Sequence, residues 1–258
     1  PTPYLLDTYE GAAAAYSLRR LRSAYTGPAV RVRRESNNDE LDIYFDGQGN
    51  LDTASLEAFC AGTNGFVKVW YDQGPGGNNA EQTTTADQPQ IVSSGSVITE
   101  GGKPTVSFTD STLNADSPDL YGQAVFDAYI AYSTSDAKYM MFSDRTPSFK
   151  YSYVIESGSS ITGLEAGYNR TSLYVNGAQV PIDGTTTRDD LYNACVQGVM
   201  TLEVHQGHTT SSWVQFKISE YPSYKLTGNV SEMIFYNSDQ STNRTGIETD
   251  INDYYNIY

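Results

Sequence analysis

The residue types that could do chemistry in this chain are mainly carboxylates and tyrosines. Its 258 residues include 31 Asp and Glu, 16 Lys and Arg, two His and 21 Tyr, and the formal net charge is -15. Two carboxyl groups roughly 5–9.5 Å apart can hydrolyse a glycosidic bond. A chain this acidic contains many accidental pairs of carboxylates, however, so the number of acidic residues does not identify a catalytic site. The local sequence pattern around each carboxylate has to identify it.

An acidic loop that contains glycine offers oxygen ligands for a metal ion. Asp46, Gln48, Asn50 and Glu57 stand at positions 1, 3, 5 and 12 of an EF-hand-like spacing, which would suit calcium. Position 6, where an EF-hand needs glycine, is occupied by Leu51. We therefore favour a plain turn that leads into a short capped helix. We expect no cofactor, with calcium as the alternative.

A glycine-rich turn at residues 74–77 follows Asp72 and Gln73. Glycines allow backbone amides to approach a ligand closely, and the two side chains could then position that ligand. The alternative is that Asp72 and Gln73 satisfy the backbone amides of their own loop. We favour this alternative and keep both residues as candidate ligand contacts.

Aromatic side chains in polar loops are the most useful binding signal. Trp213, Tyr221 and Tyr224 lie in such loops. When an exposed aromatic ring binds a ligand, it buries apolar area against that ligand while its polar group stays in water. These rings could stack on a sugar. The alternative for each is burial in the core.

The charge balance restricts the partners. The acidic excess argues against nucleic acid, which requires clustered Lys and Arg, and against an anionic membrane surface. No apolar run approaches the roughly 18 residues of a membrane-spanning helix. We expect the arginines within residues 19–34 to pair internally with Asp and Glu. We expect Cys60 and Cys195 to be buried and free, with a disulfide as the alternative.

The order of the expected elements predicts an all-β protein. We expect helices over residues 12–25, 53–61 and 241–258, and strands over 29–34, 41–45, 66–71, 90–92, 105–108, 124–132, 139–143, 152–156, 161–168, 172–175, 199–205, 214–218 and 228–236. Asn176-Gly177 is typical of a two-residue hairpin turn. Short strands without a βαβ rhythm favour an antiparallel two-sheet jelly-roll sandwich. We expect one domain over 1–258, with 1–65 as a helical extension packed on the sandwich and a short closing C-terminal helix.

Two stretches resemble known families. Within residues 16–80, the segments YSLRRLRSAYTGPAVRVRR, DIYFDGQGNLDTASLEAFC and VWYDQGPGGNNA resemble the N-terminal portion of the fungal arabinofuranosidase catalytic domain. They also resemble modules of phage tail and other virion proteins. Residues 228–258 resemble the last strand and closing helix of concanavalin A-like (laminin-G-like) lectin and glucanase sandwiches. The resemblance implies a concanavalin A-like fold.

The arabinofuranosidase resemblance also implies a Glu nucleophile on a mid-domain strand. The comparable segment, residues 173–177, reads LYVNG and contains no Glu, so Glu165 and Glu156 are the nearest candidates. The paired cysteines of that family in mid-domain are missing, because Cys195 stands alone. The resemblance therefore implies the fold more directly than the catalysis.

We interpret the chain as a non-enzymatic, extracellular virion-surface module of a phage tail, fibre or capsid. Its partners would be carbohydrate on the host or other virion proteins, and a homo-oligomer is an open alternative. The alternative function is an arabinofuranosidase-like glycoside hydrolase that acts on arabinofuranosides. A purely structural virion assembly protein is a third hypothesis.

Overall fold

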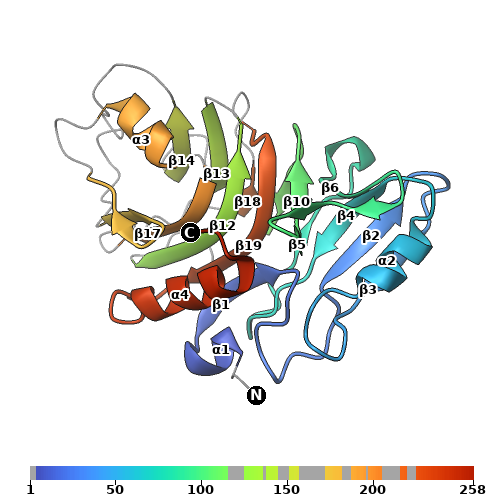
Figure 1. The fold of residues 1–258 in the computed structure, drawn as a ribbon, viewed down its shortest axis with the longest axis horizontal. Helices are drawn as coiled ribbons and strands as arrows, with labels where there is room; N and C mark the ends of the chain where they lie inside the picture. The colour runs from blue at the N-terminus through green and yellow to red at the C-terminus, as the bar shows by residue number, and fades with distance from the viewer. Residues whose placement is uncertain are drawn as a thin grey trace.

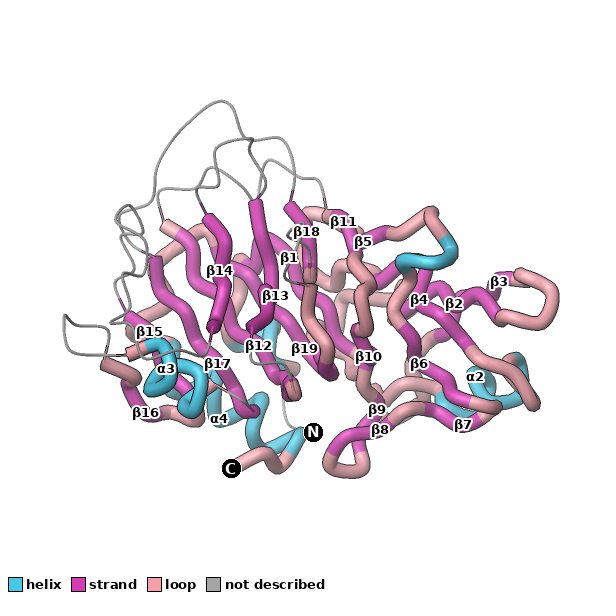
Figure 2. Tube along the Cα trace, turned by 90° about the horizontal axis from the view of Figure 1, so that it is seen from above, coloured by secondary structure: helices cyan, strands magenta, loops and turns pink. Residues whose placement is uncertain are grey.

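The computed structural model describes residues 4–115, 125–135, 138–144, 151–156, 172–181, 187–195, 197–204, 216–219 and 225–258. Antiparallel strands form two layers that face each other, and the predicted all-β sandwich is confirmed (Figures 1 and 2). The strand expected over residues 161–168 lies outside the described part. In the described part, no helix is long and apolar enough to cross a membrane.

The larger layer is built around β19, which pairs with β12 on one edge and with β1 and β10 on the other. From β12 the layer continues through β17, β15 and β16, and from β10 it continues through β6, β4, β2 and β3. Its strands are β1 (Ala12–Ser17), β2 (Val30–Arg34), β3 (Glu40–Ile43), β4 (Gly65–Trp70), β6 (Gln90–Ser93), β10 (Val106–Phe108), β12 (Phe126–Thr134), β15 (Ser172–Val175), β16 (Ala178–Gln179), β17 (Gln197–Val204) and β19 (Gly228–Tyr236).

The second layer runs through β14, β13, β18, β11 and β5, and β5 returns to β4. Its strands are β5 (Ala80–Glu81), β11 (Leu113–Asn114), β13 (Lys138–Asp144), β14 (Tyr151–Glu156) and β18 (Phe216–Ile218). The remaining elements are α1 (Leu5–Thr8), α2 (Thr53–Phe59), the 3-10 turn η1 (Thr85–Asp87), β7 (Ser96–Val97), the β8–β9 hairpin (Thr99–Glu100 and Lys103–Pro104), α3 (Arg188–Ala194) and α4 (Arg244–Tyr255).

The helix expected over residues 12–25 is wrong, because Ala12–Ser17 form strand β1. All six residues of β1 are buried, and the strand pairs with β19 through contacts such as Tyr16 with Met233. A strand buried on both faces shows a continuous apolar run, and periodicity cannot distinguish it from a buried helix. The N-terminal segment thus contributes a strand to the sheet itself.

Local signals predicted other elements correctly. Helix α2 begins after Asp52, whose side chain accepts a hydrogen bond from the Ser55 amide at 3.0 Å. Asn176 and Gly177 both have positive φ (52° and 76°) and connect β15 to β16 as a tight hairpin. The closing helix is present as α4. Cys60 and Cys195 are buried and are not joined in a disulfide, as expected.

The hydrophobic residues form two cores. The first lies between the two layers and includes Trp70, Phe108 and Phe235. The second lies on the opposite face of the larger layer, where α4 and α1 cover β1, β12, β17 and β19 (Figure 1). Ile247 and Ile251 of α4 are fully buried there.

A buried ion pair crosses the second core. Arg19 donates two hydrogen bonds to Glu232 of β19, at 2.8 and 2.9 Å, and contacts Asp250 of α4 at 2.8 Å. Ser17 donates a further hydrogen bond to Glu232 at 2.7 Å. Burial lowers the pKa of Arg19, but the charge and hydrogen bonds of Glu232 outweigh burial and the net direction is upward. Arg19 therefore stays charged, and its contacts tie the end of β1 to β19 and α4.

We predict that Arg19→Met lowers the free energy of unfolding by about 3–5 kcal/mol, because it leaves the Glu232 carboxylate buried without its partner. Urea denaturation measures this. Lys68→Met is the matched control: the Lys68–Glu40 pair is partly exposed on both sides, and its loss should cost no more than about 1 kcal/mol. Equal effects of the two substitutions would contradict the assigned role of Arg19.

Candidate functional site

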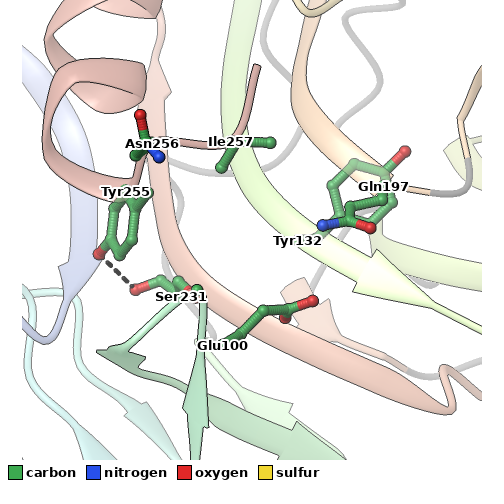
Figure 3. A pocket seen from close by; sticks show the side chains of 8 residues that line it. Glu100, Tyr132, Gln197, Ser231, Tyr255, Asn256 and Ile257 are labelled. Atoms are coloured by element: carbon green, nitrogen blue, oxygen red, sulfur yellow. Dashed lines mark hydrogen bonds between the residues drawn. The ribbon is translucent and has the colours of Figure 1, made fainter.

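A polar recess lies where four other parts of the chain meet the C-terminal end of α4. It is lined by Glu100 and Gly101 of the β8–β9 hairpin, Tyr132 of β12, Gln197 of β17, Ser231 of β19, and Tyr255, Asn256 and Ile257 at the end of α4. Figure 3 shows Tyr132 and Gln197 on one side and Tyr255 with Ser231 on the other.

Hydrogen bonds hold the walls of this recess in place. Tyr255 donates to the Ser231 carbonyl oxygen at 3.1 Å, the Ser231 hydroxyl donates to Thr105 at 3.0 Å, and Tyr132 donates to the Cys195 carbonyl oxygen. Burial raises the pKa of Tyr255 well above its ordinary value, and nearby Glu232 acts in the same direction. The Tyr255 hydroxyl therefore remains a neutral hydrogen-bonding group.

The end of α4 is shaped by Asn252 and Asn256. Asn256 adopts the left-handed conformation at the helix C-cap, with φ 52° and ψ 55°, which asparagine tolerates better than most residues. The Asn252 carboxamide accepts from the Ile257 and Tyr258 amides, at 3.0 and 2.9 Å. These bonds fold the last residues back toward the recess.

The recess has the chemistry of a binding site for a small polar group. Hydroxyl, amide and carboxylate groups line it together with aromatic rings, a combination that recognises sugars. Glu100 is its only carboxylate among the lining residues. Because glycoside hydrolysis requires two carboxyl groups, the recess does not contain the pair needed to cleave a sugar.

Three deeply buried carboxylates, Glu232, Glu248 and Asp127, are already engaged. Glu232 binds Arg19. Glu248 accepts hydrogen bonds from Thr201 at 2.6 Å and Arg244 at 2.8 Å, and Asp127 accepts one from the Gln240 amide at 2.7 Å. All of these contacts lie on the face that α4 covers. They stabilise the packing of the second core.

Asp72 and Gln73 act as anchors of the glycine-rich turn. The Asp72 carboxylate accepts from the amides of Ala15, Gly74 and Asn78, each at 2.7 Å. Gln73 accepts from the Leu21 amide at 2.7 Å and donates to the carbonyl oxygens of Ser17 and Arg19. Burial raises the pKa of Asp72 although the three amides lower it. The bonds from Gly74 and Asn78 are those of the structural alternative, whereas the other bonds join the turn to residues 15–21. Ligand binding by either residue stays a prediction.

The acidic loop folds as a turn. Asp46 accepts hydrogen bonds from the amides of Gln48 and Asn50, at 2.8 and 2.9 Å, while Asn50 also accepts from Tyr254. Glu57 lies in α2 and accepts from the Val97 amide at 3.2 Å. Across the described residues, no group of three or more His, Cys, Asp or Glu could hold a metal ion. The contacts are those of the favoured turn.

The other candidate residues cannot be placed. Trp213, Tyr221, Tyr224 and Glu165 lie outside the described residues, and Glu156 is described only as the last residue of β14. They remain predictions. Internal pairing of the arginines is confirmed for Arg19 with Glu232, Arg31 with Asp42 and Arg34 with Asp39.

Sequence reasoning missed the recess. Its lining residues come from elements that are far apart in the chain, and none of them belongs to a local motif. The asparagine at position 256, directly after the residues of the closing helix, was the nearest available signal, since asparagine is favoured at such a helix end.

We predict that Asp72→Asn lowers the free energy of unfolding by about 1.5–3 kcal/mol, because the new NH2 group faces a backbone N–H donor where an acceptor is needed. Urea denaturation again provides the measurement. Asp253→Asn, an exposed position on α4, should leave stability within about 0.5 kcal/mol. An Asp72→Asn protein as stable as the Asp253→Asn protein would show that the turn does not depend on this carboxylate.

Comparison with known proteins identifies similar sequences and folds. Residues 7–162 match the family described as the catalytic part of alpha-L-arabinofuranosidase B. An alpha-L-arabinofuranosidase from Hypocrea jecorina is 40% identical over 70 residues, and a probable alpha-L-arabinofuranosidase B from Aspergillus terreus is 38% identical over 71 residues. Each match covers 27% of this chain and 14% of the relative.

Solved structures show the same fold over nearly the whole chain. An arabinofuranosidase in complex with arabinofuranosyl-alpha-1,2-xylobiose aligns with a TM-score of 0.57 and 14% identity, over 96% of this chain and 64% of the other. A GH54 arabinofuranosidase soaked with a cyclic sulfate inhibitor aligns over the same shares with a TM-score of 0.56 and 12% identity.

These matches overturn the interpretation as a virion module. The family model and the curated relatives are arabinofuranosidases, and the relatives come from fungi. The predicted phage-tail or capsid-surface identity, the virion partners and the virion-surface location are therefore wrong. The motifs in residues 16–80 were shared between two groups of proteins, and the arabinofuranosidase side of the resemblance was the correct one. The extracellular location stays a prediction.

Proposed function

Because the chain belongs to the family of alpha-L-arabinofuranosidase B catalytic domains, we propose that it is a glycoside hydrolase that releases arabinofuranosyl groups from a carbohydrate. The observation that supports this most is the family match, which spans residues 7–162 and thus more than half of the chain. The common fold with arabinofuranosidases over 96% of the chain agrees with it.

The proposed reaction needs an acid and a second carboxylate on opposite sides of the scissile bond. Glu232, Glu248 and Asp127 do not suit this role, because they are buried and hydrogen bonded beneath α4. Glu156, at the end of β14, and Glu165 are our candidates for the pair.

The proposal predicts hydrolysis of 4-nitrophenyl α-L-arabinofuranoside by the purified chain, followed through the release of 4-nitrophenol. Glu156→Gln and Glu165→Gln should each reduce kcat by about 10²–10⁴-fold, since an amide can neither donate the acid proton nor act as a carboxylate nucleophile. Glu81→Gln, an exposed position, is the control and should keep full activity.

Two outcomes would count against the proposal in different ways. Full activity in both variants would remove Glu156 and Glu165 from the mechanism while the hydrolase assignment stands. No hydrolysis by the unmodified chain, with retained binding of the arabinofuranoside in calorimetry, would favour a second function: a relative that binds the sugar without cleaving it. Strand β15, which reads Ser-Leu-Tyr-Val and has no carboxylate, is the observation in favour of that second function.

A further inference from the structure

The exposed face of β2, β3 and the end of β4 carries an unusual group of side chains. We call it the Tyr44 platform, and it consists of Tyr25, Arg31, Asp42, Tyr44 and Tyr71. The Tyr44 side chain is 50% exposed, which makes it the most exposed large hydrophobic side chain in the described part of the chain. In both views β3 lies at the end of the molecule opposite α3 (Figures 1 and 2).

Strand geometry places Arg31, Asp42 and Tyr44 on one face. Asp42 and Tyr44 are two residues apart, so their side chains point to the same side of an extended chain. Arg31 of β2 is the direct cross-strand partner of Asp42, and directly opposed residues share a face. Tyr71 follows β4, and its backbone amide donates a hydrogen bond to the carbonyl oxygen of Ala29, just before β2, at 3.0 Å.

Hydrogen bonds fix the polar part of the platform. Arg31 donates two bonds to the Asp42 carboxylate, both at 2.8 Å, and the Tyr71 hydroxyl donates a third at 2.8 Å. Arg31 and Tyr71 hold the pKa of Asp42 below its ordinary value, with Arg31 the larger cause. The carboxylate is thus ionised and held in one orientation.

Tyr25 extends the same surface. Its hydroxyl donates to the Pro28 carbonyl oxygen at 2.8 Å, and its ring meets Phe45 edge-on with centroids 6.3 Å apart. Burial raises the pKa of Tyr25 to about 12, with Asp72 and Tyr44 as further causes. A side chain placed at Gly27 would come within 2.7 Å of the Tyr25 hydroxyl, so it would displace the Tyr25 ring.

The charges on this face cancel in pairs. Arg31 pairs with Asp42, and Lys68 of β4 pairs with Glu40 of β3 at 2.6 Å. Each of these two pairs is neutral, although the chain as a whole carries a formal charge of -15. An anionic ligand would find no free cation among these residues, and a cationic one would find no free carboxylate. The matching ligand is uncharged and rich in hydroxyl groups.

We propose that the Tyr44 platform binds an uncharged polysaccharide chain, with the exposed Tyr44 ring stacked on a sugar ring and the fixed Arg31–Asp42 pair hydrogen bonded to sugar hydroxyls. Aromatic rings beside planar polar groups supply both the apolar and the hydrogen-bonding surface that a sugar presents. The choice of polysaccharide rests on the proposed function, and a xylan that carries arabinofuranosyl side groups is its natural substrate class.

Affinity electrophoresis in gels that contain soluble arabinoxylan tests this with the full chain. We expect Tyr44→Ala to weaken retardation and raise the dissociation constant by about threefold to tenfold, the size expected when one stacking contact is lost. Arg31→Ala should weaken binding as well. Tyr258→Ala is the matched control, because Tyr258 is 49% exposed and lies at the C-terminus, outside the platform. Polygalacturonate, an anionic polymer, should not retard any of these proteins.

The outcomes separate this inference from the proposed function. Tyr44→Ala should leave kcat/KM on 4-nitrophenyl α-L-arabinofuranoside unchanged, because that substrate is too small to reach the platform from a distant site. Retardation that depends on Tyr44 supports the platform even when the chain hydrolyses nothing. The platform is overturned if the unmodified chain is not retarded by arabinoxylan, or if Tyr44→Ala and Tyr258→Ala bind equally well.

Discussion

The buried contact between Arg19 and Glu232 is the constraint on which the larger layer depends. Glu232 lies at the centre of β19, the strand that joins β12 to β1 and β10. Arg19 follows β1 directly and also reaches Asp250 of α4. Two charged side chains can remain buried in a hydrophobic core only when they are paired and fully hydrogen bonded. The pair therefore fixes the position of the N-terminal strand relative to the C-terminal helix.

This arrangement divides the acidic residues by role. On the face covered by α4, carboxylates meet Arg19, Arg244, Thr201 and backbone amides, and they hold the second core. The turn around Asp72 uses the same principle on a smaller scale, since one carboxylate organises three amides. A glycosidase on this scaffold needs its reacting pair elsewhere, on surface that a sugar can reach.

How far the sequence predicts the molecule depends on whether the signal is local. The Asp52 cap and the Asn176-Gly177 turn depend on neighbouring residues, and both were predicted correctly. Strand β1 was mistaken for a helix, because its partner β19 lies at the other end of the chain and alanine-rich runs favour helices. The recess brings together Glu100, Tyr132 and Gln197 from separate elements, and no local pattern marks such a meeting. The prediction of a virion module was wrong for a related reason, because short motifs identify a fold that several functional classes of protein share.

A crystal structure of the chain with an arabinofuranosyl oligosaccharide tests the central claim most directly. The account predicts that the reacting arabinofuranosyl ring lies between two carboxyl groups roughly 5–9.5 Å apart, away from the face that α4 covers. A sugar bound against Glu232, Glu248 or Asp127, with those side chains released from their partners, would contradict it.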